Sequence, residues 1–468
     1  MLKVILKGHD KYYGTADVVR LFFPSPTEDR AGGTVWCKDA PDIVIESELL
    51  PSGECVCRTK DKEYRFDGAP EEVGREIKRS LYMALSDICG IAPPWGCLTG
   101  IRPTLVAAQT GSAEELSRRY LVRPDKAKLA AETAAAEIGL LERIVPQDIN
   151  IYIGVPFCPS RCEYCSFVSS DISHHMGRLG EYKEHLIREI KTLSPKITRR
   201  IATLYIGGGT PTVFSDEDFA ELIDAVYGNL DIDPDCEVTV EAGRPDTITD
   251  RKLSHMASHG IKRICINPQT MNDVTLAKLN RRHTAADTLR SIEAARQNGF
   301  EVINSDLIAG LKYETPEDFI DTAEKIIATG ISNITVHTLY KKRRAAMSLA
   351  DVMASAKEVD DAVTAVYGML EKAGYRPYYM YKQKDTGHGL ENTGFEKGGT
   401  ACLYNVAMMT DARDVLSFGA GGMSKRVFGQ VDTAKYRVER CSSSKDVLDY
   451  MMRTDEIAAK KAEFFELS

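Results

Sequence analysis

The feature that most constrains the fold is an alternation of apolar strands and amphipathic helices, which runs from about residue 148 to about residue 350. The predicted strands are short and rich in branched aliphatic residues: INIYIGV, IATLYIG, CEVTVEA, IKRICIN, FEVINSDLI and ISNITVHTL. Helical periodicity fills the intervals, as in EYKEHLIREIKTL, DEDFAELIDAVYGNL, TDRKLSHMASHG, ADTLRSIEAARQNG and PEDFIDTAEKIIATG. This pattern predicts an α/β fold, either a partial (β/α)6 barrel or an open parallel sheet. In both topologies the functional residues gather at the C-terminal ends of the strands.

The flanking segments have a different rhythm. The first 68 residues contain strand-like stretches separated by turn residues: KVILKG, GTADVVRLFF, TVWC, DIVIES, ECVCRT and YRFDG. Helical stretches follow in EEVGREIKRSLYMALSDICG, AEELSRRY and PDKAKLAAETAAAEIGLLERI. We predict an N-terminal α+β domain at 1–147, the barrel at 148–350, and a C-terminal α+β extension at 351–468 that covers the barrel mouth.

Composition narrows the class of protein. A formal charge of -8 argues against nonspecific binding to nucleic acid or to an anionic membrane, because both draw on excess Lys and Arg. No apolar stretch is long enough to span a membrane, and the apolar core of MLKVILKGHD is too short for a signal peptide, so we expect a cytoplasmic protein. Because cytosolic thiols are kept reduced, we do not expect the 12 cysteines to form a disulfide framework. Five of them have irregular spacing and are interpreted as buried thiols: Cys37, Cys55, Cys57, Cys89 and Cys97.

Three other cysteines form a compact motif in GVPFCPSRCEYCSFVSS, directly after the first predicted barrel strand. Cys158, Cys162 and Cys165 have the spacing Cys-x3-Cys-x2-Cys, which lets three thiolates converge on one metal centre. Structural zinc is the alternative, but it takes four ligands and no second Cys/His pair is evident. A cubane [4Fe–4S] cluster with three protein thiolates leaves one iron open to an amine and a carboxylate of a small molecule.

The Cys motif resembles the signature of radical S-adenosylmethionine (SAM) proteins. Further motifs appear in the order seen in oxygen-independent coproporphyrinogen III dehydrogenases: LYIGGGTPT, VTVEAGRPDT, INPQTM, NRRHT and NSDLIAGL. Outside the barrel, the chain is similar to the HemZ subgroup of that family in TGIRPTL, YKQKDTGHGLENTGF and SFGAGGMSK. The resemblance implies a partial barrel of the radical SAM type, a [4Fe–4S] cluster held by the three cysteines, and SAM as the second cofactor.

The resemblance also implies a set of SAM contacts. Glycines after the second strand let the backbone approach a ligand, and a carboxylate at the end of the third strand suits the SAM ammonium. An arginine matches the methionine carboxylate, an amide and a carboxylate match the ribose hydroxyls, and aromatic rings match the adenine. The predicted residues are Tyr152, Tyr164, Phe167, Gly207, Gly208, Gly209, Thr210, Glu241, Gln269, Arg281 and Asp306. The alternatives are an ordinary βα turn, a solvated glutamate, Arg282 in place of Arg281, and aromatic rings that only pack the loop.

The family's chemistry supplies an expectation for the reaction. Reductive cleavage of SAM gives a 5′-deoxyadenosyl radical, which takes a hydrogen from a propionate of coproporphyrinogen III, and loss of carbon dioxide leaves a vinyl group. The expected partners are a porphyrinogen or haem-like tetrapyrrole and a low-potential electron donor such as flavodoxin or ferredoxin. The basic run at 341–344 is either a clamp for the propionates or a solvated loop. No catalytic residue is assigned.

Two features separate this chain from the dehydrogenases proper. Those enzymes carry a further cysteine where this chain has Phe167, and an arginine-bearing segment where this chain has residues 1–147. A second class of function is haem delivery, because proteins of the HemW type, which resemble this chain in its barrel, act as haem chaperones. Their C-terminal motif contains a His and a Trp that CLYNVAMM lacks, although His283, His337 and His388 remain conceivable axial ligands. A third hypothesis is radical degradation or another modification of a porphyrin.

Overall fold

The computed structural model describes residues 1–23, 25–165, 170–171, 177–339, 349–383, 389–429 and 436–467. The chain divides into two compact units. The first contains Met1–Ala135, Thr338–Asp361 and Met380–Asn392, and the second contains Ala136–His337, Ala362–Tyr379 and Thr393–Ser468. The predicted division into three domains stays a prediction.

The first unit contains a six-stranded sheet in the order β2-β3-β1-β4-β5-β6. Its strands are β1 (Leu2–Lys7), β2 (Thr27–Asp29), β3 (Thr34–Cys37), β4 (Ile43–Leu49), β5 (Glu54–Arg58) and β6 (Glu63–Asp67). The helices in this part of the chain are α1 (Tyr12–Arg20), α2 (Val73–Cys89), α3 (Pro103–Thr110), α4 (Ala113–Tyr120) and α5 (Pro124–Leu141). Of the five cysteines interpreted as buried thiols, Cys89 is only partly buried and the others are buried.

One predicted strand of this unit is wrong. The segment GTADVVRLFF contains most of helix α1 and the residues that follow it. Its buried residues include Ala16, Val19 and Phe23, which are three or four positions apart and therefore share one face of a helix. That face joins a core cluster with residues of β1 and α2, such as Val4 and Leu81.

The second unit contains the predicted βα units. The six predicted strands are β7 (Ile149–Val155), β10 (Ile201–Gly208), β11 (Glu237–Glu241), β12 (Arg263–Cys265), β13 (Val302–Ala309) and β14 (Asn333–Thr338). They are consecutive in a sheet of order β15-β16-β14-β13-β12-β11-β10-β7-β17-β18-β19. The pairs from β7 through β13 are parallel. The α/β fold with a partial barrel is therefore confirmed, and it follows from strands that are buried on both faces.

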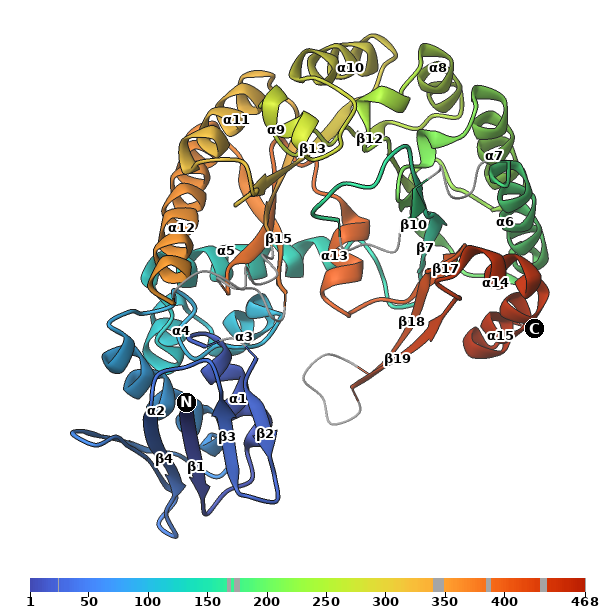
Figure 1. The fold of residues 1–468 in the computed structure, drawn as a ribbon. Helices are drawn as coiled ribbons and strands as arrows, with labels where there is room; N and C mark the ends of the chain where they lie inside the picture. The colour runs from blue at the N-terminus through green and yellow to red at the C-terminus, as the bar shows by residue number, and fades with distance from the viewer. Residues whose placement is uncertain are drawn as a thin grey trace. The chain divides into compact units, whose positions relative to one another are not determined.

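Helices cover the outer side of these strands (Figure 1). They are α6 (Leu179–Leu193), α7 (Asp216–Asn229), α8 (Asp250–Ser258), α10 (Ala285–Gln297) and α11 (Pro316–Ala328). Side chains mark where several of them begin: the Thr284 and Thr315 hydroxyls each accept from a backbone N–H three residues on, and Asp287 and Asp318 return the contact in capping boxes. These side chains therefore fix the first residue of α10 and of α11.

The remaining strands extend the sheet at its two ends, except for β8 and β9, which pair with each other in a separate two-stranded sheet. The strands are β8 (Phe157–Cys158), β9 (Ser170–Asp171), β15 (Arg376–Lys382), β16 (Glu391–Glu396), β17 (Val415–Phe418), β18 (Met423–Phe428) and β19 (Arg437–Ser442). The helices are α9 (Asp273–Lys278), α12 (Leu349–Lys372), α13 (Leu403–Met409), α14 (Val447–Met452) and α15 (Thr454–Phe465). Among the described residues, no helix has the length and apolar character needed to cross a membrane.

A buried ion pair connects α6 to the C-terminal elements. The Lys461 ammonium lies 2.6 Å from a Glu189 carboxylate oxygen, and both side chains are 0% exposed. Glu189 also accepts from the Gly419 N–H at 2.8 Å and from the Tyr450 hydroxyl at 2.7 Å. The carboxylate is thus satisfied from three directions, which a buried charge requires.

We predict that Lys461→Met lowers the free energy of unfolding by about 3–5 kcal/mol, because Glu189 would keep its charge in the core without a counterion. Urea denaturation measures this change. Lys460→Met is the matched control, since Lys460 is exposed on the same helix; it should change stability by no more than about 0.5 kcal/mol. Equal effects of the two substitutions would contradict the prediction.

Candidate functional site

The cysteine loop leaves the C-terminal end of β7. Cys158 belongs to the short strand β8, and the Cys165 N–H donates to the Cys162 carbonyl at 3.1 Å in a tight turn. All three thiols are partly exposed, unlike most of the other cysteines. The Cys158 sulfur lies 3.7 Å from the hydroxyl of Thr210, which follows β10. The loop therefore presents accessible sulfur atoms at the edge of the sheet where functional residues were expected.

Two buried guanidinium groups face the middle cysteine of this loop. Arg281 Nη1 lies 3.7 Å and Arg244 Nη1 lies 3.9 Å from the Cys162 sulfur. Positive charge at this distance stabilises a thiolate or an anionic metal–sulfur centre. Two positively charged groups therefore lie within 4 Å of the Cys162 sulfur.

Arg281 uses most of its donors within the protein. Its Nη1 also donates to the Tyr164 hydroxyl at 3.1 Å, and its Nη2 donates to the carbonyls of Gly243 and Asn267. The Nε atom is buried without a hydrogen-bond partner. Nε is thus the donor left for a ligand, and the assignment of Arg281 to the methionine carboxylate stays a prediction. Its neighbour Arg282 is exposed.

Arg244 is a site residue that sequence reasoning missed. Its guanidinium pairs with Asp246 at 3.0 Å and donates to both the carbonyl and the hydroxyl oxygen of Ser160, at 3.2 Å each. Arg244 therefore binds the cysteine loop through Ser160 and also places a positive charge beside Cys162. The signal was present in VTVEAGRPDT, where an arginine follows Glu241 closely, but nothing in the sequence indicated that it turns towards the loop.

The glycine turn after β10 fits tightly against the start of the cysteine loop. The Gly209 N–H donates to the Val155 carbonyl at 2.7 Å. A Cβ on Gly209 would lie 2.4 Å from the Phe157 carbonyl oxygen, and one on Gly208, whose φ is +118°, would lie 2.8 Å from the Val155 oxygen. No other residue type fits here without moving backbone.

Glu241 ends β11 and faces this turn. Its carboxylate accepts from the Gly208 N–H at 3.2 Å. Burial, together with the nearby charge of Asp306, raises the pKa of Glu241 to about 8, which the contact with Gly208 only partly offsets. At neutral pH the carboxyl group is therefore largely protonated, and a cation beside it would favour the carboxylate form.

Gln269 and Asp306 lie together at the ends of the next two parallel segments. The Gln269 N–H donates to the Asp306 carbonyl at 3.0 Å. Gln269 has φ +70°, which is uncommon for a residue with a side chain, and its Oε1 atom is buried without a partner. Burial favours the neutral form of Asp306, but contacts with His337 and Asn304 outweigh it and lower the pKa of its carboxyl group. An unsatisfied amide oxygen beside a carboxylate suits a diol.

The three predicted aromatic residues have different outcomes. Tyr152 stacks with Tyr205 at a ring separation of 6.3 Å and with Tyr404 at 6.1 Å, and the last two stack at 4.7 Å. Sequence reasoning missed Tyr205 and Tyr404. Tyr164 contacts Arg281, as described above. Phe167 lies outside the described residues.

These residues fit the cofactors that the motif implies. Three accessible thiols, a turn that Cβ atoms would fill, an unpaired amide oxygen and an unpaired guanidinium nitrogen occupy the ends of successive strands. Zinc is a poorer fit, because structural zinc takes four protein ligands and the motif supplies three. Of the histidines considered for haem, His283 is buried near Asp246, with a separation of 3.8 Å, and burial lowers its pKa. His388 and the basic run at 341–344 lie outside the part of the chain that the structure describes.

Comparison with known proteins decides the family. Residues 152–326 match the model of the radical SAM superfamily. The chain is 32% identical over 448 residues to the oxygen-independent coproporphyrinogen-III oxidase-like protein HemZ of Bacillus subtilis, covering 91% of this chain and 88% of that protein. This chain belongs to the HemZ family of radical SAM proteins. Its cofactors are therefore a [4Fe–4S] cluster and SAM.

Two further proteins are similar to the chain at lower identity. The haem chaperone HemW of Haemophilus influenzae is 27% identical over 293 residues, which cover 60% of this chain and 71% of that protein. In fold, the chain is similar to coproporphyrinogen III oxidase (HemN) of Escherichia coli, with a TM-score of 0.52, 20% identity, and coverage of 70% of this chain and 73% of that one. The HemZ family thus shares its barrel with proteins of more than one function.

We predict that Arg244→Gln shifts the reduction potential of the cluster to more negative values by an amount on the order of tens of millivolts. Reduction adds negative charge, and the substitution removes a positive charge beside Cys162. An EPR-monitored redox titration measures the shift. Arg282→Gln, which removes an exposed arginine, should leave the potential unchanged.

Arg244→Lys separates charge from loop geometry, because it keeps the charge and loses the forked contacts. Its potential should stay near that of the unmodified protein even if cluster loading falls. If the Lys and Gln variants shift equally, the charge of Arg244 does not set the potential.

Proposed function

We propose that this protein is a radical SAM oxidoreductase that converts propionate side chains of coproporphyrinogen III to vinyl groups without oxygen, giving protoporphyrinogen IX. Its support is the similarity to HemZ along nearly the whole chain and to the fold of HemN. Each propionate would lose a hydrogen atom to the 5′-deoxyadenosyl radical, an electron to a one-electron acceptor, and carbon dioxide. The tetrapyrrole substrate and a low-potential electron donor such as flavodoxin or ferredoxin are the proposed partners.

The observation that carries the proposal is the convergence of the cysteine loop with the polar ends of successive strands. Cys158, Cys162 and Cys165 would hold the cluster and leave one iron for the amine and carboxylate of SAM. When bound, the cluster and SAM supply the radical that starts the reaction. The protein's own residues bind and orient these groups and keep water from them.

The individual roles are assigned by the chemistry of each side chain. Glu241 would accept from the SAM amino group, Arg281 would donate to the carboxylate, and Gln269 and Asp306 would bind the ribose hydroxyls. The glycine turn and Thr210 would contact the methionine part. Aromatic contacts to the adenine are assigned to Tyr152, Tyr164 and Phe167.

Haem delivery is the second candidate function, because HemW chaperones are relatives. The feature of this chain that bears on it is Cys402, which precedes α13 in the segment comparable to the HemW motif. Its side chain is 3% exposed, and burial raises the pKa of the thiol to about 12. A sequestered, protonated thiol is unsuited to ligate haem iron, so the enzymatic function is favoured.

We predict that the anaerobically reconstituted protein, with a reductant and SAM, releases 5′-deoxyadenosine faster when coproporphyrinogen III is added and forms protoporphyrinogen IX. Chromatography of both products measures this. Cys162→Ala should abolish cluster loading and product formation together, whereas Cys236→Ala, which removes a cysteine outside the motif, should retain both. SAM cleavage with unchanged porphyrinogen would refute the substrate, and stoichiometric haem transfer without turnover would identify a chaperone.

We predict that SAM binding at about pH 7 releases up to about one proton from Glu241, since its carboxyl group, with a pKa of about 8, must ionise to accept from the amino group of SAM. Affinity should therefore rise as the pH approaches 8 from below. Calorimetry in buffers of different ionisation enthalpy counts the protons. Glu241→Gln should weaken binding and lower the release by the proton that Glu241 contributes.

The matched control for this measurement is Glu314→Gln. Burial also raises the pKa of Glu314, to about 7, but this residue contacts Thr270 rather than the glycine turn. The control should still release the proton. If only Glu314→Gln loses the release, the proton comes from Glu314, and its assignment to Glu241 is wrong.

A further inference from the structure

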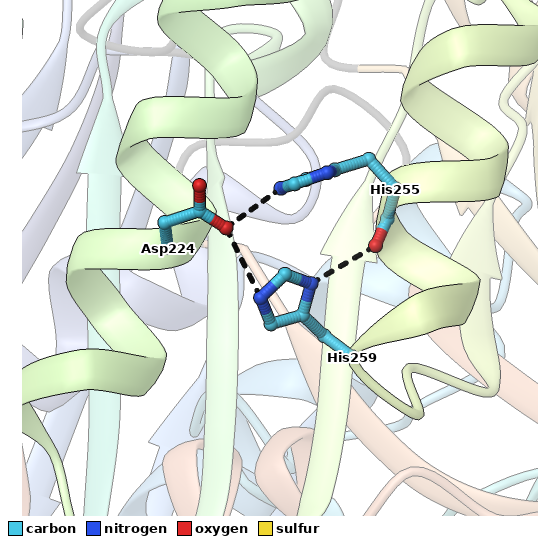
Figure 2. A group of neighbouring side chains, drawn as sticks. All are labelled: Asp224, His255 and His259. Carbon is cyan, nitrogen blue, oxygen red and sulfur yellow. Dashed lines mark hydrogen bonds and ion pairs between the residues drawn. The ribbon is translucent and has the colours of Figure 1, made fainter.

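Two helices on the outer side of the barrel bring together two histidines and an aspartate (Figure 2). Asp224 lies on α7, and His255 and His259 lie four positions apart at the end of α8. Asp224 Oδ1 is 2.9 Å from His255 Nε2 and 3.1 Å from His259 Nε2. One ligand atom from each residue lies within 4.8 Å of the other two. Three atoms of metal-ligating type therefore converge on one point.

The hydrogen bonds of His259 fix which ring nitrogen faces the aspartate. Its Nδ1 lies 3.0 Å from the His255 carbonyl, which can only accept, so Nδ1 carries the proton. The Ser258 hydroxyl lies 3.4 Å from the same nitrogen and donates its own proton to the His255 carbonyl, so it too is available as an acceptor. Nε2 is therefore the ring nitrogen that faces the Asp224 carboxylate, at 3.1 Å.

At 3.1 Å from the Asp224 oxygen, Nε2 of His259 is placed to share a cation with that carboxylate, either a proton or a metal ion. A backbone carbonyl that fixes the far nitrogen is also the usual support for a histidine that ligates a metal. Nδ1 of His259 has that support, and its ring packs against Tyr227 at 4.9 Å. These contacts of the His259 ring therefore fix the position of Nε2, the nitrogen that would bind a metal.

We propose that Asp224, His255 and His259 bind a divalent transition-metal ion of the zinc class. Two imidazoles with one carboxylate favour zinc, nickel, cobalt or copper over magnesium or calcium, which prefer oxygen ligands. Bonds of about 2.0–2.2 Å place ligand atoms roughly as far apart as the two short separations here. The side chains of His255, His259 and Asp224 are 27%, 22% and 58% exposed, which leaves an open position for water.

The location separates this site from the SAM chemistry. In a βα unit the helix runs antiparallel to its strand, so the end of α8 lies at the N-terminal edge of the sheet. The cysteine loop follows the C-terminal end of β7 and lies at the opposite edge. The bound metal would link α7 to α8 in the outer helical layer and stabilise the barrel, whatever reaction the barrel performs.

The test uses protein that already carries its cluster, so that Cys158, Cys162 and Cys165 are occupied. Anaerobic calorimetry with Zn²⁺ should show one saturable equivalent, which excess Mg²⁺ does not displace. Zn²⁺ should also raise the unfolding temperature. His259→Ala and Asp224→Asn should each weaken binding by about tenfold or more and abolish the thermal shift.

His185→Ala is the matched control, since His185 is a partly buried histidine on neighbouring α6 that contacts Thr454 instead. It should bind Zn²⁺ like the unmodified protein. The metal-free unfolding temperatures of the variants show whether each has folded, and Asp224→Asn keeps the shape of the side chain. Absence of saturable binding, equal binding by His259→Ala, or zinc uptake only with loss of cluster iron would overturn the proposal.

Discussion

Parallel pairing between β7 and β10 is the constraint on which the site depends. In this register Val155 lies opposite Gly208, and the Gly209 N–H then reaches the Val155 carbonyl at 2.7 Å. The next pairing sets Val240 of β11 opposite Ile206, so the following residue, Glu241, reaches the Gly208 N–H. A slip of one residue would turn each of these groups to the other face of the sheet. The cysteine loop, the glycine turn and Glu241 therefore meet because the strands pair in this way.

The distribution of charge follows from the same arrangement. Arg244 and Arg281 enter from the ends of later units, and both reach the Cys162 sulfur from buried positions. Low polarity around them strengthens the attraction to an anionic centre. On the far side of the turn, burial keeps Glu241 largely neutral until a cation is present. The site thus combines permanent positive charge at the sulfur with a carboxyl group whose charge depends on its ligand.

Much of the barrel could be predicted because its signals are local. Six strands and the helices between them follow from periodicity, and the Cys-x3-Cys-x2-Cys loop follows from spacing. The α1 segment was mistaken for a strand because its branched residues favour β structure, whereas packing against α2 selects the helix. Arg244 was missed since its direction depends on Ser160, far away in sequence. Tyr404 was missed because its partner Tyr152 is brought near only by the completed sheet.

The glycine-rich segment SFGAGGMSK near the C-terminus packs against the end of β7. β17 pairs in parallel with β7 on the side away from β10. A Cβ on Gly419 would lie 2.4 Å from the Gly154 carbonyl, and the Tyr182 hydroxyl donates to that carbonyl at 2.7 Å while it accepts from the Ala420 N–H at 3.0 Å. The C-terminal end of β7 therefore has contacts on both edges, with β10 and with β17, before the cysteine loop begins. Because the buried pair of Glu189 and Lys461 anchors Gly419 in turn, packing in the C-terminal elements determines how firmly the loop is placed.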